Sequence, residues 1–176
     1  MPKLNYFLRK APCFLNKEIL EKYDSIIRNA LEDILNVKLD GRAWEQSTLP
    51  IKLGGLGIKL ASEVALPGYL SSAYATNSIV QRLIPDHMKE DQNVLYEQGV
   101  QEWKVLLGSN DLPDNPHFQS EWDSPLYGKR HKNLLESAPS KIEKARLLAV
   151  SSENSSDYMP YQCHLWALNL PIQACA

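Results

Sequence analysis

The chain has 176 residues, of which 44% are hydrophobic and 23% are charged, and its formal net charge is −2. This length and apolar content suffice for a hydrophobic core, and the near-neutral charge lacks the overall basicity typical of many nucleic-acid-binding proteins. No apolar run is long enough to span a membrane, and no signal peptide is evident. We therefore expect an intracellular protein, cytoplasmic or nuclear, with no membrane partner.

Charge is distributed unevenly along the chain. Residues 1–60 contain ten Lys or Arg and seven Asp or Glu, residues 61–128 contain three and ten, and residues 129–176 contain six and four. A polyanion would meet the two ends of the sequence more readily than its middle. The alternative interpretation is ordinary scattered surface charge.

The first third of the chain predicts helices. Residues 3–10 predict a short helix that Pro12 ends. Asn16 is a suitable N-cap for a longer helix, whose apolar residues recur at three- and four-residue spacing and whose opposite face includes Arg28 and Glu32. We expect the apolar face to dock onto a core; it consists of Ile19, Tyr23, Ile26, Ile27, Ala30, Leu31, Ile34 and Leu35.

Residues 36–46 predict a turn and a short helix, which the segment 49–58 (LPIKLGGLGI) follows. Its three glycines, Gly54, Gly55 and Gly57, predict a tight structural turn. A phosphate-binding loop is the alternative, but the segment lacks the Lys-Ser/Thr pair of a P-loop and the spacing of a dinucleotide fingerprint. Its aliphatic side chains suit a core better than a pyrophosphate.

Further helices are predicted in the remainder of the chain. Ser62 can cap a short helix that ends near Leu66, and a second helix would start with Pro67 in its first turn and end at Pro85. Another helix would end at Gly108. Residues 109–127 read as a long surface loop anchored by aromatics, helical signals return at 129–137, and Ser140 can cap a last helix. The tail, residues 158–176, shows no period.

These elements indicate a mainly α fold, an irregular helical bundle with a Gly-rich turn, a long loop and a poorly ordered C-terminal tail. No catalytic constellation is evident. Cys13, Cys163 and Cys175 match neither a zinc spacing nor a disulfide framework, even with His131 and His164 considered, and no serine lies in a Gly-x-Ser-x-Gly elbow. We therefore expect no cofactor, no metal and no enzymatic activity.

Contact with nucleic acid is the best physical candidate for a function. Lysine and arginine bind phosphates without reading sequence, and five such cations would support weak, salt-sensitive binding. The alternative is a solvated surface. The candidate residues cluster in sequence around aromatic and apolar side chains, and they are Lys3, Arg9, Lys10, Lys52 and Lys59.

The order of several short segments resembles the region that follows the catalytic palm in reverse transcriptases of non-LTR-type retrotransposons. The resemblance covers about residues 1–157, and no single piece is highly specific. The segments are KLNYFLR at 3–9, APC at 11–13, YDSIIR at 23–28, WEQ at 44–46, LPIKLGGLGI at 49–58, ALPGYLSS at 65–72 and ARLLAVSS at 145–152.

The resemblance implies a helical thumb and the helices after it, which in such polymerases grip a primer–template duplex. The metal-binding carboxylates of the palm would be missing, since the chain has no Asp-Asp pair. We therefore expect a truncated, non-catalytic fragment whose ancestral packing partner is the palm and whose residual partner is an RNA or DNA duplex. The expected divisions are a thumb-like region at 1–108, a loop at 109–127 and helices at 128–157. A helical protein-interaction module is the alternative.

The tail departs from the resemblance. There the family leads us to expect a stretch similar to WLHAIPVPSLGTKL, whereas residues 158–171 read YMPYQCHLWALNLP. One set of codons for the expected stretch, read in another frame, encodes the observed residues. Our hypothesis is that the tail is a frameshifted translation, so that its cysteines and histidine were never selected as a site.

Overall fold

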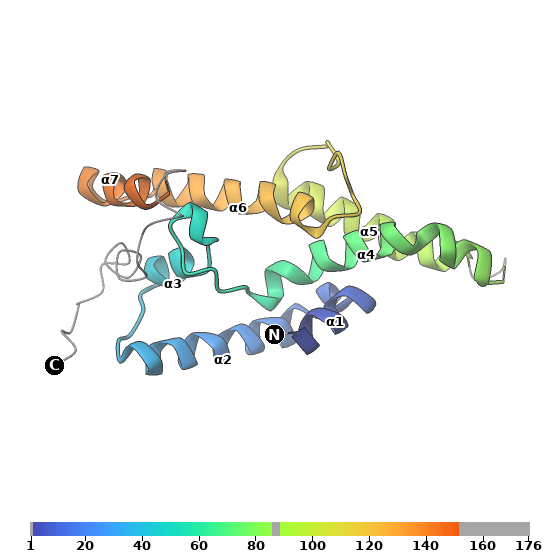
Figure 1. Cartoon of the computed structure of the whole chain (residues 1–176), viewed down its shortest axis with the longest axis horizontal. Helices are drawn as coiled ribbons and strands as arrows, with labels where there is room; N and C mark the ends of the chain where they lie inside the picture. Colours follow the sequence, from blue (N-terminus) through green and yellow to red (C-terminus); the bar gives the residue numbers. More distant parts are fainter. Residues whose placement is uncertain (1, 86–88, 152–176) are drawn as a thin grey trace. The chain divides into compact units, whose positions relative to one another are not determined.

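A computed structural model describes residues 2–85 and 89–151. Within these ranges the elements are helical and no strand occurs (Figure 1), so the predicted mainly α fold class is confirmed. No described helix is both long enough and apolar enough to cross a bilayer. The predicted poorly ordered tail lies outside the described residues.

The chain folds as two compact units that interleave in sequence. Unit 1 comprises residues 1–24 and 60–126, and unit 2 comprises residues 25–59 and 127–176. Helices α2 (Lys17–Leu35) and α6 (Gln119–Glu136) each belong partly to both units. Segments distant in sequence therefore pack together within each unit.

Unit 1 is built around helix α4 (Ala61–Leu83), against which α1 (Pro2–Lys10) and α5 (Lys89–Leu107) pack (Figure 1). A short 3-10 helix, η1 (Cys13–Leu15), follows α1 and also contacts α4. The core is continuous and aromatic-rich; its buried members are Leu8, Phe14, Leu20, Ala61, Val64, Ala65, Leu66, Leu70, Val100, Trp103 and Trp122.

Two tryptophans form the densest part of this core. The rings of Trp103 and Trp122 meet edge to face with centroids 5.1 Å apart, and the Nε1–H of Trp103 donates to the Trp122 carbonyl at 3.1 Å. The Nε1–H of Trp122 donates to the carbonyl of Pro116 at 2.9 Å. Each indole is thus buried with its polar group satisfied, as aromatic cores require.

Burial of Trp122 corrects the predicted loop at residues 109–127. Helix α6 begins at Gln119 and continues through Pro125, and Trp122 is 0% exposed. Pro125 and the polar residues around it conceal the helical period in the sequence. We attribute the helix to the large apolar area that Trp122 buries, which outweighs weak local propensity.

Helix α4 corrects a second prediction, because it is continuous through Pro67. Its first turn is capped by Asp24 of α2: the N–H groups of Ala61 and Ser62 donate to the carboxylate at 2.6 and 3.1 Å, and the Ser62 hydroxyl donates at 2.5 Å. Ser62 is therefore a partner of the cap and not the cap itself. Pro67 is fully buried, so packing offsets the hydrogen bond that its missing N–H forfeits.

Unit 2 contains α3 (Gly41–Ser47), a 3-10 helix η2 (Ile51–Leu53) and α7 (Lys141–Val150), with the ends of α2 and α6. Asp40 caps α3 by accepting from the Ala43 N–H. Ser140 caps α7 by accepting from the Glu143 N–H, as predicted. The core consists of Leu49, Leu134 and Leu147, with Leu53 and Leu135 packed against it.

The glycine segment turns the chain back along α3. The N–H groups of Leu56 and Gly57 donate to the carbonyls of Ser47 and Leu49 at 3.1 and 2.9 Å. Gly54 and Gly57 have φ angles of 81° and 71°, which side-chain-bearing residues rarely adopt. A Cβ on Gly55 would lie 2.6 Å from the Gln46 carbonyl oxygen and closer still to that of Leu49. No side chain fits there.

Helix α2 docks differently from its predicted orientation. Ile26 and Ile34 are 64% and 81% exposed, and Ile19 is also exposed. Glu32, predicted to face solvent, is buried. In unit 1 the helix buries Leu20 and Asp24 and packs the predicted Tyr23 against the core, and in unit 2 it buries Glu32, so apolar contacts and hydrogen-bonded carboxylates together fix its inward face.

Replacing Gly55 by alanine should lower the free energy of unfolding by about 3 kcal/mol or more, because the methyl group collides with fixed backbone. Gly128→Ala in α6 is the matched control: nothing lies within 4 Å of its added Cβ, so we expect stabilisation of roughly 0.5–1 kcal/mol. Urea unfolding followed by circular dichroism measures both. Equal stability of the two variants would contradict the described turn.

Replacing Asp24 by alanine should destabilise unit 1 by about 1–2 kcal/mol, since the first N–H groups of α4 lose their acceptor. Asp33→Ala, at an exposed position of the same helix, should change stability by less than about 0.5 kcal/mol. The same unfolding measurement applies. A larger effect of Ser62→Ala than of Asp24→Ala would restore Ser62 as the cap.

Candidate nucleic-acid interface

The five predicted cations are divided between the two units. Arg9 and Lys10 belong to unit 1, and Lys52 and Lys59 belong to unit 2. Lys3 lies on α1, but its side chain is outside the described part of the chain. The predicted cations therefore form two separate sets, one in each unit.

Arg9 and Lys10 form the last turn of α1, where cations complement the helix macrodipole. Both are exposed. The stem of Arg9 passes over Gly68, so that a Cβ on that glycine would lie 3.5 Å from the Arg9 Cγ. The Lys10 ammonium lies 5.9 Å from the ring centroid of Tyr6, within cation–π range. The Arg9 stem therefore lies against α4, and Lys10 lies over Tyr6 of its own helix.

A groove of about 550 Å³ runs beside these two cations. Its wall is α4, which carries no charged residue between Glu63 and Arg82. Burial raises the pKa of the Tyr69 phenol in this wall above its ordinary value. The groove thus combines cations with hydroxyl and apolar groups; its lining is Arg9, Lys10, Pro12, Tyr69, Ser72, Ala73, Thr76, Ile79, Val80, Ile84 and Leu95.

Lys52 and Lys59 flank the glycine turn of unit 2. Lys52 lies in η2, Lys59 follows the turn, and both are exposed. Neither takes part in an ion pair with another described residue. Because Gly54 of the turn lies against Val150 of α7, the turn that carries Lys52 is fixed to the last turn of that helix.

Other basic residues of unit 2 were missed by the sequence reasoning. Unit 2 contains eleven Lys or Arg and eight Asp or Glu, a net charge of +3, whereas unit 1 contains eight and thirteen, a net charge of −5. Lys141 and Lys144 are exposed on α7, three residues apart and hence on one helix face. The excess of cations in residues 129–176 was the available signal, but it did not identify which of them reach solvent.

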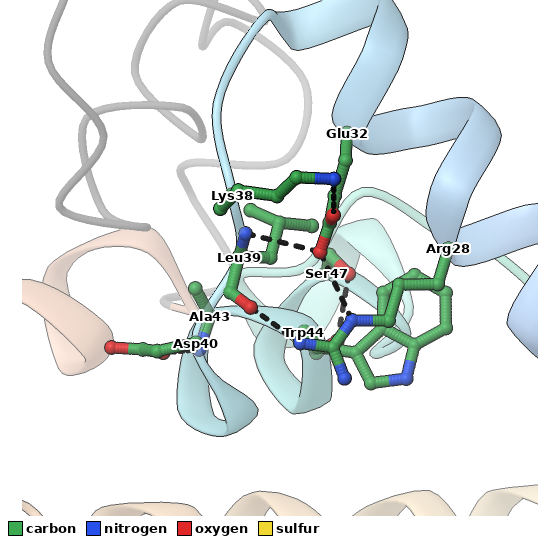
Figure 2. A network of polar contacts seen from close by, with 8 residues as sticks. All are labelled: Arg28, Glu32, Lys38, Leu39, Asp40, Ala43, Trp44 and Ser47. Carbon is green, nitrogen blue, oxygen red and sulfur yellow. Dashed lines mark hydrogen bonds and ion pairs between the residues drawn. The ribbon is translucent and has the colours of Figure 1, made fainter.

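Several cations of unit 2 are engaged in holding the fold. Figure 2 shows Glu32 accepting hydrogen bonds from Arg28 Nε at 3.1 Å, from Lys38 Nζ at 2.8 Å and from the Leu39 N–H at 3.2 Å. Arg28 also donates to the Leu39 carbonyl and lies 5.8 Å from the ring centroid of Trp44. The carboxylate is fully occupied, so this cluster ties α2 to the segment before α3 and offers no free acid or base.

Two further arginines have the same structural role. Arg42 donates to the carbonyls of Leu134 and Ser137, each at 2.9 Å, and Arg130 donates to the Thr48 hydroxyl at 2.7 Å. These bonds join α3 and its following turn to α6. The basic residues left for an external ligand in unit 2 are therefore chiefly lysines.

The remaining candidates for chemistry do not converge. His131 is half-buried in unit 2, its Nε2 has no hydrogen-bond partner among the described residues, and burial lowers its pKa. Among the described residues no three His, Cys, Asp or Glu side chains are grouped as a metal site would require. The three residues of the tail that were weighed as zinc ligands lie outside the described residues; they are Cys163, His164 and Cys175.

The pKa of Glu32 is lowered, mainly because Lys38 donates to the carboxylate, with further help from the Leu39 N–H and Arg28 against the opposing effect of desolvation. Its stabilising contribution is therefore present above the ordinary pKa of 4.5 and is lost as the pH falls through the lower folded-state value. Glu32→Gln should lower the urea midpoint at neutral pH and flatten its acid dependence. Glu136→Gln, at an exposed α6 position, is the control; an unchanged acid dependence in Glu32→Gln would contradict the network.

Comparisons with protein families, with curated proteins and with solved structures find no significant match to this chain.

Proposed function

We propose that this protein binds nucleic acid without sequence specificity, through the exposed lysines of unit 2. The observation that carries the proposal is the charge of unit 2, a net +3 with Lys52 and Lys59 exposed and unpaired among the described residues. Lys141 and Lys144 add exposed charge in the same unit. Such cations neutralise phosphates and release counterions, which gives weak binding that salt weakens further.

The type of side chain supports binding without sequence specificity. Lysine is a compact point charge that contacts phosphate without the paired donors with which arginine reads guanine. Three of the four arginines of unit 2 are held within the fold: Arg28 and Arg42 by Glu32, Glu143 and backbone carbonyls, and Arg130 by the Thr48 hydroxyl and the Glu45 carbonyl. Phosphate contact therefore positions the protein on nucleic acid but does not discriminate between sequences.

The same proposal includes descent from a retrotransposon reverse transcriptase. It is supported by the order in which several short family-like segments occur along the chain, among them LPIKLGGLGI at 49–58. In this view the chain is non-catalytic, and duplex binding is what remains of a thumb. The genomic DNA around the coding region tests the descent: a palm-encoding stretch nearby, and a family-like reading in another frame at the tail, are expected, and the absence of both would contradict it.

Binding to a short DNA duplex, measured by fluorescence anisotropy over a salt series, tests the function. We expect affinity to fall with salt, and the double variant Lys52→Ala/Lys59→Ala to reduce the slope of log K against log salt by about 2, roughly 0.9 per lost contact. Lys17→Ala/Lys22→Ala in unit 1 removes the same charge from positions that pair with Glu102 and Glu18, and should leave the slope unchanged. A folded protein that binds no duplex at low salt would exclude the proposed function.

A protein-interaction module is the second candidate. One observation favours it: Ile26, Ala30 and Ile34 are exposed on α2 within unit 2, at spacings that place them on one helix face. Ile26→Asp/Ile34→Asp separates the two functions. If nucleic-acid binding is the function, this double variant keeps the affinity and salt slope of the unchanged protein.

A further inference from the structure

We propose that the groove beside Arg9 and Lys10 in unit 1 binds an unpaired nucleotide, so that the protein prefers single strands or strand ends at this site. The inference rests on the proposed nucleic-acid binding and adds a ligand class that the unit 2 lysines do not define. It is carried by the juxtaposition of two cations with an uncharged wall that contains a tyrosine and apolar side chains.

The size and lining of the groove suit a nucleotide. Its volume, about 550 Å³, lies within the range of small-ligand sites. The described lining residues include Arg9 and Lys10 but no carboxylate, so among these residues a phosphate would meet two cations. Ser72 and Tyr69 supply hydroxyl groups, and Ala73 and Pro12 supply apolar surface.

The apolar and aromatic part distinguishes an unpaired strand from a duplex. A duplex presents phosphates on its outside and keeps its bases stacked, so it would use the two cations and leave the wall unfilled. An unpaired base exposes its π-face and can stack on aromatic or apolar side chains, a contact that tolerates every base. Tyr69 lines the groove, and its ring packs against Phe14 with centroids 5.4 Å apart, which fixes its position.

The positions of the two cations also suit the binding of a phosphate. The stem of Arg9 lies over Gly68 of α4, its Cγ 3.5 Å from the position that a Cβ on that glycine would take. Lys10 rests over Tyr6. Neither forms an ion pair with another described residue, so a phosphate need not displace an internal carboxylate. Because unit 1 carries a net charge of −5, it repels a long nucleic acid that lies along its surface. Contact with only one or two phosphates at the groove is therefore favoured.

Anisotropy with a labelled oligothymidine, an abasic strand of equal length and a duplex tests the proposal on the full chain. We expect the oligothymidine to bind roughly tenfold more tightly than the abasic strand for each base accommodated. Ala73→Phe, which fills the groove, should remove this difference, while Ala75→Phe, exposed on the same helix, should preserve it. Arg9→Ala/Lys10→Ala should lower the single-strand salt slope by about 1.4, roughly 0.7 per phosphate.

The outcomes separate this inference from the function on which it rests. If oligothymidine and abasic strand bind equally, or if Ala73→Phe and Arg9→Ala/Lys10→Ala both leave single-strand binding unchanged, the groove site is excluded even while Lys52→Ala/Lys59→Ala weakens duplex binding. If neither strand nor duplex binds the folded protein, the proposed function itself fails. Because Arg9 and Lys10 are exposed, their variant tests the site even if Ala73→Phe does not fold.

Discussion

The contact between the backbone at Gly55 and the carbonyls of Gln46 and Leu49 is the constraint on which unit 2 depends. It folds the chain after α3 back on itself, so that Leu49 enters the core with Leu134 and Leu147. The Gln46 side-chain amide donates to the Gly54 carbonyl at 3.0 Å inside this turn. A side chain at position 55 would collide with both carbonyls and displace the backbone that places Leu49 in this core.

Other elements of unit 2 are fastened to the same turn. Thr48 receives Arg130 from α6, and Gly54 leaves room for Val150 of α7. The turn therefore carries Lys52 and Lys59 on a support that α3, α6 and α7 share. A phosphate-binding loop would need free N–H groups at a helix start, whereas the N–H groups of residues 53–58 are bonded to carbonyls within the turn: Leu53 and Gly55 to Pro50, Gly54 to Ile51, Leu56 and Ile58 to Ser47, and Gly57 to Leu49. The segment therefore supports the side chains of Lys52 and Lys59, and its backbone does not form a phosphate-binding loop.

The sequence predicted the elements whose signals are local and missed those fixed by distant partners. Gly108 ends α5 with φ of 77° and Ser140 caps α7, as their residue types indicate. Asp24 could not be identified as the cap of α4, because its partner is 37 residues away. The inward face of α2 was predicted from apolar spacing alone, whereas the hydrogen-bonded Asp24 and Glu32 are buried beside Leu20 and several of the predicted isoleucines are exposed. The start of α6 depends on Trp122, whose burial no local pattern shows.

For the candidate site, the basic residues could be identified from the sequence, but whether each is exposed or engaged in internal contacts could not. Lys52 and Arg28 are equivalent in a count of charges, yet one is exposed and the other is held by Glu32, Trp44 and a backbone carbonyl. The groove beside Arg9 was not predictable, since its wall is formed by residues about sixty positions further along the chain. In the sequence, Lys141 and Lys144 are ordinary surface residues of a predicted helix. The structure shows that this helix, α7, packs against the glycine turn of unit 2.

The opposite charges of the two units give the proposed binding modes different sensitivities to salt. Screening weakens the attraction of phosphates to unit 2, which carries a net +3, and at the same time weakens their repulsion by unit 1, which carries a net −5. Stacking of a base in the groove of unit 1 depends little on ionic strength, because it involves no counterion release. Duplex binding, which relies on contacts between charges and gains no base stacking, should therefore decline faster with salt than single-strand binding. The preference for unpaired nucleic acid consequently increases with ionic strength, although both affinities fall.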